Sequence, residues 1–250
     1  LPEGRSRVAG TANSPGFSAG YLYKHPGGKT SFGLMFRSAV VNHLRGKASF
    51  AFTSNYPLEK FLGSDFLPKA FPTHAISGVF TTPATYGFGL ANSSLWNNTT
   101  LSFDFRVQDY RRFRSLPLNF SKTPQNDKDA QTPAERRLHF DFRDSFHLAF
   151  GFEKRMSETL AFRAGYLFDR SPVVDKSVGP LFPDSNQHSF MVGASRKRGN
   201  LEMTIFYQGA QFVNRTVNVA ANAKLGTNGE YRTFVHLAGM GLRMHIGKPR

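Results

Sequence analysis

Large apolar side chains recur at every second position over many short stretches of the chain. Between residues 30 and 52 the even positions include Phe32, Leu34 and Phe36, whereas the odd positions are mostly small or cationic. A β-strand places alternate residues on opposite faces, while a helix would spread this pattern around its circumference. The alternation therefore predicts a strand over residues 30–52.

The same alternation predicts about nine strands in all. The further stretches are 84–92, 99–109, 139–153, 160–169 and 201–208, with weaker ones at 17–24, 188–196 and 232–246. Short connections rich in turn residues, such as Pro26-Gly27-Gly28, alternate with long polar or Pro-rich ones. No strand–helix alternation is present, which argues against a doubly wound α/β fold.

Two architectures accommodate such strands: a soluble sandwich with its apolar faces inward, and a transmembrane barrel with its apolar face toward lipid. Three features favour the barrel. The apolar face is rich in Phe and Tyr, the other face mixes Gly, Ala and Ser with charges of both signs, and the connections alternate between short and long. We therefore predict an all-β, antiparallel transmembrane β-barrel of the outer-membrane type, with the even-numbered Phe of 32–36 and 146–152 facing lipid.

Composition excludes several other classes of protein and of site. No run of about 18 to 20 apolar residues is present, which excludes a helical membrane protein, and 26 Phe among 250 residues argue against disorder. Cys is absent, so disulfides, thiolate metal sites and Cys nucleophiles are excluded.

The formal net charge of +15 suggests an anionic partner. Two basic clusters, at 111–114 and 196–198, lie at predicted strand ends, where they suit lipid headgroups or lipopolysaccharide phosphates. We expect outer-membrane lipid and lipopolysaccharide as partners, and no nucleic acid.

No catalytic motif stands out. The sequence has no H-x-x-x-H or H-E-x-x-H pair, no G-x-S-x-G elbow and no G-x-x-x-x-G-K-[ST] loop. We expect a protein that is not an enzyme and that uses no cofactor and no metal.

Several segments resemble a known family, in the same order along the chain. They are 17–23, 29–38, 82–89, 100–113, 142–151 and, most specifically, 162–173 with 182–188, which includes Asp169-Arg170-Ser171-Pro172-Val173 and Phe182-Pro183-Asp184. These segments are similar to the outer-membrane long-chain fatty acid and hydrocarbon transporters, the FadL/TodX family. The resemblance implies an outer-membrane channel for uptake of long-chain fatty acids or similar hydrophobic compounds, in a Gram-negative type of cell.

The resemblance covers only the C-terminal part of such a protein. Single-chain bacterial barrels have even strand numbers, so about nine strands indicate an incomplete part of a larger barrel. We expect residues 1–250 to form a single β-barrel domain, with the signal peptide, the hatch and the first strands absent from this sequence.

One connection, 53–72, is long, apolar and aromatic. A hydrophobic ligand needs an apolar landing surface, since exposing an alkyl chain to water costs roughly 0.8 kcal/mol per CH₂. The candidate surface consists of Phe61, Leu62, Phe66, Leu67 and Phe71. Lys60 and Lys69 lie among them and could meet a carboxylate. The alternative is that these side chains only pack the loop onto the barrel rim.

Charges on the polar faces are candidates for a carboxylate contact inside the barrel. Arg143 and Arg163 occupy such positions by alternation, and the resemblance implies a cationic ligand contact near Arg137. The alternative is a neutralised internal network with Asp104, Glu153 and Glu202. Two other functions stay open: a general structural or diffusive outer-membrane barrel, and a soluble basic β-domain that binds anionic polymers.

Overall fold

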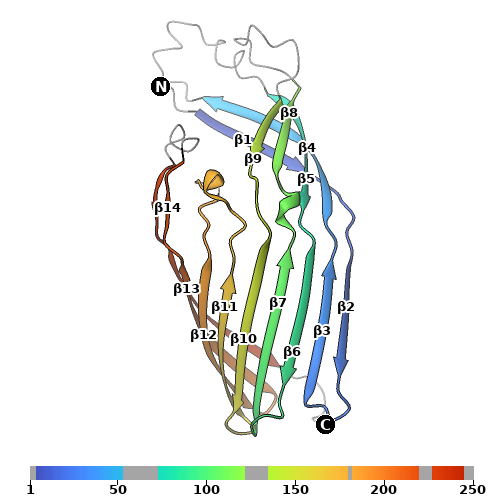
Figure 1. The fold of residues 1–250 in the computed structure, drawn as a ribbon, viewed down its shortest axis with the longest axis vertical. Coiled ribbons are helices and arrows are strands. Elements are labelled where there is room, and N and C mark those ends of the chain that lie inside the picture. The colour runs from blue at the N-terminus through green and yellow to red at the C-terminus, as the bar shows by residue number, and fades with distance from the viewer. Residues whose placement is uncertain (1–3, 53–72, 122–134, 180–181, 220–226, 245–250) are drawn as a thin grey trace, which may run out of the picture. The chain divides into compact units, whose positions relative to one another are not determined.

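A computed structural model describes residues 4–52, 73–121, 135–179, 182–219 and 227–244. The described part of the chain contains sixteen β-strands and two short 3₁₀ turns, Tyr110–Arg112 and Asp175–Ser177. All strand pairs are antiparallel, and they form sheets of nine, five and two strands (Figure 1). No helix in the described residues is long and apolar enough to cross a membrane.

The nine-stranded sheet belongs to a compact unit made of residues 17–38, 83–111 and 141–250. The strands of this sheet, in order from one edge to the other, are β16 (Phe234–Met244), β13 (Leu201–Phe212), β12 (Gln187–Arg198), β11 (Leu160–Asp169), β10 (Ser145–Arg155), β7 (Thr99–Gln108), β6 (Thr85–Asn92), β3 (Thr30–Arg37) and β2 (Ser18–Lys24). Each of these strands overlaps one of the nine predicted stretches. The order is linear, so β16 and β2 are the two edges of an open sheet in the described residues, as expected for part of a barrel.

Short turns join β2 to β3, β6 to β7, β10 to β11 and β12 to β13, and all four lie at the same end of the sheet, at the bottom of Figure 1. Gly28 and Gly199 have φ values of 70° and 59° in two of these turns, where the left-handed region favours glycine. The register is regular along every pair, so alternate residues keep to one face across the whole sheet.

One face of this sheet, here called the apolar face, carries the large side chains. Phe103, Phe150, Tyr166 and Phe190 form one of its rows, because each pairs directly with the next across four strands. Phe150 is 49% exposed and Phe190 is 62% exposed. A soluble sandwich would bury this row, so the exposure favours a lipid-facing surface, as predicted for the barrel.

The five-stranded sheet belongs to the other compact unit, residues 1–16, 39–82 and 112–140. Its order is β1 (Gly4–Thr11), β4 (Val40–Phe52), β5 (His74–Thr82), β8 (Ser115–Phe120) and β9 (Glu135–His139). Ala48 and Ile76 are buried on one face, whereas Arg45 and Lys47 are exposed. The alternation analysis missed β1, which precedes the first predicted stretch, and also β5, β8 and β9, which lie between predicted stretches except for His139 at the end of β9.

The single strand predicted over residues 30–52 is two strands in the structure, β3 and β4, in different units. The break falls at Ser38, where the backbone N–H of Phe17 donates to the Ser38 hydroxyl at 3.0 Å and the Ser38 N–H donates to the Phe17 carbonyl at 2.9 Å. These bonds tie Ser38 to the residue that precedes β2.

The stretch predicted over residues 139–153 is also divided. Asp141 has a φ of 46°, and β10 begins only at Ser145. Phe140 and Phe142, predicted on the apolar face of a strand, are both buried at 6% exposure. Phe140 stacks on Phe113 with ring centroids 5.1 Å apart, so aromatic packing rather than lipid accounts for their apolar character.

Candidate functional site

The second face of the nine-stranded sheet, here called the polar face, carries linked charged side chains. Arg106, His147 and Asp169 lie on three adjacent strands, with Arg106 Nη2 3.0 Å from His147 Nε2 and His147 Nδ1 3.0 Å from Asp169 Oδ1. A guanidinium can only donate, so Nε2 accepts this bond and Nδ1–H donates to the carboxylate. The three side chains therefore form a chain of hydrogen bonds that runs across β7, β10 and β11.

Arg163, one of the sequence-predicted ligand residues, lies closer to the short turns on the same face. Its Nε donates to Glu153 Oε2 at 2.8 Å and its Nη1 donates to the Ser195 hydroxyl at 2.9 Å. Arg155 also contacts Glu153, at 3.3 Å. These contacts are those of an internal network, and a ligand role for Arg163 stays a prediction.

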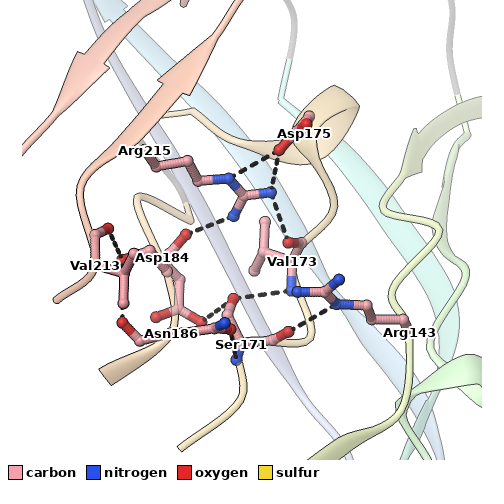
Figure 2. Close-up of polar contacts among 9 residues, drawn as sticks. Arg143, Ser171, Val173, Asp175, Asp184, Asn186, Val213 and Arg215 are labelled. Carbon is pink, nitrogen blue, oxygen red and sulfur yellow. Dashed lines mark hydrogen bonds and ion pairs between the residues drawn. The ribbon is translucent and has the colours of Figure 1, made fainter. Parts of the chain in front are cut away.

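At the opposite end of the sheet, polar contacts tie together the segment 171–186, which connects β11 to β12 (Figure 2). The Ser171 hydroxyl donates to Asp184 Oδ2 at 2.7 Å and accepts from the Val173 N–H at 3.1 Å. The Ser171 N–H donates to Asn186 Oδ1 at 3.0 Å. Ser171, at the start of the segment, is thus hydrogen-bonded to Asp184 and Asn186 at its end.

Two arginines hold this segment from outside it. Arg215, in the short strand β14 (Arg215–Val217) that pairs with β15 (Gly229–Tyr231), contacts Asp175 at 2.6 Å and donates to the carbonyls of Val173 and Asp184 at 2.9 and 2.8 Å. Arg143 donates from Nε to the Ser171 carbonyl at 3.1 Å. We call this group, Arg143, Arg215 and the segment they bind, the arginine cluster.

The arginine cluster borders a polar cavity of about 310 Å³. It is lined by Arg143, Val174, Asp175, Ser185, Asn186, Val213, Asn214 and Arg215. Burial, followed by the like charges of Arg170 and Arg215, lowers the pKa of Arg143 below its ordinary value, with Asp175 opposing the shift. Among the described residues, no acceptor contacts the two terminal nitrogens of Arg143. The cavity can therefore present a guanidinium to an anion.

Only some of the predicted site residues are among those that the structure describes. The landing surface Phe61, Leu62, Phe66, Leu67 and Phe71, with Lys60 and Lys69, lies outside the described residues. Arg137 lies in β9, where its register partner is Pro117 of β8, and its side chain is not among those described. Arg143 and Arg163 lie at different ends of the polar side and do not share a site. Alternation predicted that Arg143 lies on a strand, and this was wrong, because β10 begins only at Ser145.

Sequence reasoning missed Arg215, because a lone arginine in a long polar connection carries no periodic signal. Ser171 and Asp184 lay within the most specific segments of the family resemblance, and that motif was the available signal for the cluster. In the described part of the chain, no group of three or more His, Asp or Glu side chains could hold a metal ion.

Residues 3–244 match the family model described as Outer membrane protein transport protein (OMPP1/FadL/TodX). The chain belongs to this family. The FadL/TodX family consists of β-barrel proteins of the Gram-negative outer membrane, so the chain is an outer-membrane β-barrel protein, as predicted.

Solved structures of this fold agree with that membership. A Pseudomonas aeruginosa FadL homologue is 16% identical, with a TM-score of 0.72 over 92% of this chain and 52% of that one. The toluene transporters TodX of Pseudomonas putida and TbuX of Ralstonia pickettii are 17% and 15% identical, with TM-scores of 0.53 and 0.55. They are matched over 82% and 97% of this chain, and over 45% and 51% of their own lengths.

The chain spans about half the length of these FadL/TodX structures. No curated protein sequence matches it significantly.

Proposed function

We propose that the complete protein is a non-enzymatic channel for the uptake of long-chain fatty acids or similar hydrophobic compounds across the outer membrane. Membership of the FadL/TodX family over residues 3–244 is the observation that carries this proposal. Two structures with the same fold are described as toluene transporters, which supports a hydrophobic cargo.

The polar face supports a passage rather than a packed core. Several of its charges are paired, as in the contact of Arg163 with Glu153, and a wall of charged and polar side chains can stay hydrated. A hydrated wall does not bind alkyl chains. The ligand therefore needs an apolar surface before it enters, and the aromatic stretch with Phe61 and Phe66 is the proposed landing surface.

The arginine cluster supports a ligand that bears a carboxylate. The Nε of Arg143 donates to the Ser171 carbonyl, which orients the guanidinium, and Arg143 is one of the residues that line the cavity. Bidentate pairing between a guanidinium and a carboxylate is strong and geometrically specific. Fatty acids would use this contact, whereas aromatic hydrocarbons would not.

The test is uptake by a bacterial strain that lacks its own hydrophobic-compound transporters and expresses the full-length gene. Labelled oleate and labelled toluene are supplied at limiting concentration, with a small hydrophilic sugar as a third arm. Uptake of oleate above the empty-vector strain, without a parallel rise in sugar entry, is the expected result. Equal stimulation of all three arms would indicate a general diffusive barrel, and no stimulation of oleate or toluene would contradict the proposal.

A further inference from the structure

Positive charge lies on the apolar face of the nine-stranded sheet at one end only. The regular register assigns every residue of the nine strands to one face, and no Asp or Glu falls on the apolar face. Within these strands, Lys154, Arg196 and Arg198 are the three Lys or Arg residues on it. All three lie within the last three residues before a short turn.

The neighbours of the two arginines are apolar, and two of them are exposed. Arg196 pairs directly with Leu160 on one side and Met203 on the other, and Arg198 pairs with Leu201. Met203 is 49% exposed and Leu201 is 43% exposed. The two arginines, both exposed, therefore border the apolar belt at its short-turn end.

Cations on the two faces differ in their partners. On the polar face, Arg155 and Arg163 share Glu153, and Arg243 lies 3.8 Å from Glu202. On the apolar face, neither Arg196 nor Arg198 forms an ion pair with any described residue. A cation at the edge of a lipid-facing surface extends its charged group toward the headgroup layer, where phosphates are the available anions.

We propose that Arg196 and Arg198 form a docking site for the phosphate headgroup of an anionic membrane phospholipid, in the leaflet at the short-turn end of the barrel. Two residues apart on one strand, their Cα atoms are roughly 7 Å apart. Two guanidinium groups at that spacing can bind the oxygens of one headgroup from the same side.

The same face offers room for the acyl chains. A shallow apolar hollow of about 570 Å³ lies across β6, β7, β10 and β11, with Phe103, Phe152, Ala164 and Tyr166 among its lining residues. Ala164 leaves space between the aromatic rings. Lys154 lies at the short-turn end of this hollow, two residues beyond Phe152, and donates to the Asn97 carbonyl at 2.8 Å. It adds a third positive charge at the headgroup level.

Native mass spectrometry of the full-length protein in detergent tests the site. The protein is titrated with dioctanoyl phosphatidylglycerol or with dioctanoyl phosphatidylethanolamine, and bound lipid is counted. The variants are R196Q/R198Q, the charge-preserving R196K/R198K, and K197Q as a matched control. Lys197 lies between the two arginines but on the polar face, opposite Glu202.

The unmodified protein is expected to prefer phosphatidylglycerol, and R196Q/R198Q is expected to lose at least about fivefold in affinity for it, since each cation near a lipid surface contributes roughly that factor. K197Q and R196K/R198K are expected to keep most of the affinity, and inorganic phosphate at the same concentration should not compete.

Equal binding by R196Q/R198Q and the unmodified protein would overturn the proposal, as would an equal loss in K197Q. Displacement by inorganic phosphate would instead indicate a free-anion site. If R196Q/R198Q does not fold, as shown by loss of the heat-dependent gel shift of folded barrels, R198Q alone serves as the test variant. An unchanged affinity for phosphatidylglycerol in R198Q then overturns the proposal.

Discussion

Arg215 binds one carboxylate oxygen of Asp175 through two nitrogens, Nε at 2.9 Å and Nη2 at 2.6 Å, although the two residues are 40 positions apart in the chain. The same guanidinium also reaches the carbonyls of Val173 and Asp184. One side chain from β14 thus joins both ends of the segment 171–186, which is closed internally by Ser171. The family motif in this segment therefore has a structural role that depends on a residue outside the motif.

Replacing Arg215 with Gln is expected to loosen the segment 171–186. The side chain of Arg215 is only 15% exposed, so its bonds to the two carbonyls are shielded from water, whereas Asp175 is 62% exposed and contributes less. Losing these bonds should cost about 2 kcal/mol, measured by urea unfolding in micelles. Arg232→Gln removes an exposed pair with Glu230 and is the control; an equal effect of both changes would contradict this role.

Arg143→Gln is expected to reduce the uptake of acidic ligands but not that of neutral ones. If the terminal guanidinium nitrogens bind a carboxylate, oleate uptake at limiting concentration should fall several-fold, while toluene uptake stays unchanged, since toluene has no charged group. Lys176→Gln removes a nearby exposed cation that pairs with Asp141 at 2.8 Å and should affect neither. Parallel loss of both ligands in Arg143→Gln would point to a purely structural role.

A cation introduced on the apolar face of β12 is expected to destabilise the barrel more than one introduced on the polar face. Phe190→Arg places a cation in the middle of the apolar face and should reduce barrel stability by roughly 2–4 kcal/mol, the cost of Arg near the bilayer midplane. Met191→Arg, one residue further, places the same charge on the polar face and should cost much less. The comparison is made by unfolding both full-length variants in lipid vesicles, and similar losses would contradict the face assignment.

The double change Phe61→Ser and Phe66→Ser is expected to weaken the capture of fatty acids from dilute solution. Two aromatic side chains are removed from the proposed landing surface, but no strand of the nine-stranded sheet is altered. Uptake of oleate should fall most at limiting concentration and recover when oleate is abundant, with normal expression and a normal heat-dependent gel shift. Unchanged uptake at limiting oleate would leave these side chains only a packing role.

Period-2 alternation correctly predicted the strands of the nine-stranded sheet, because each of them has one lipid-facing and one polar face and so carries the full contrast between faces. The same rule failed at Phe140 and Phe142, where apolar residues two apart are buried against aromatic rings outside any strand. It also missed β5 and β8, which belong to the sheet of the other compact unit.

The candidate site was predictable only in pieces. Arg143 and Arg163 could both be singled out as polar-face charges, and alternation treats the two residues alike. The contacts distinguish them: Arg163 binds Glu153 and Ser195, whereas Arg143 donates from Nε to the Ser171 carbonyl and lines a cavity. Which cation meets which acceptor depends on strand register and on connections that no local pattern encodes.

The sequence by itself determined the strand periodicity, the chemical contrast between two faces and the family, because these depend on residue types and on spacing along the chain. Tertiary structure alone decided where the strands at Ser38 and Asp141 break, and which distant side chains meet, as Arg215 meets Asp175. It also decided that β12 extends through Arg198, beyond the predicted stretch 188–196, so that Arg196 and Arg198 lie together on the exposed apolar face. The physical reason is that pairing partners are set by antiparallel register between strands, which joins residues far apart in sequence and is fixed by the assembly of the whole sheet.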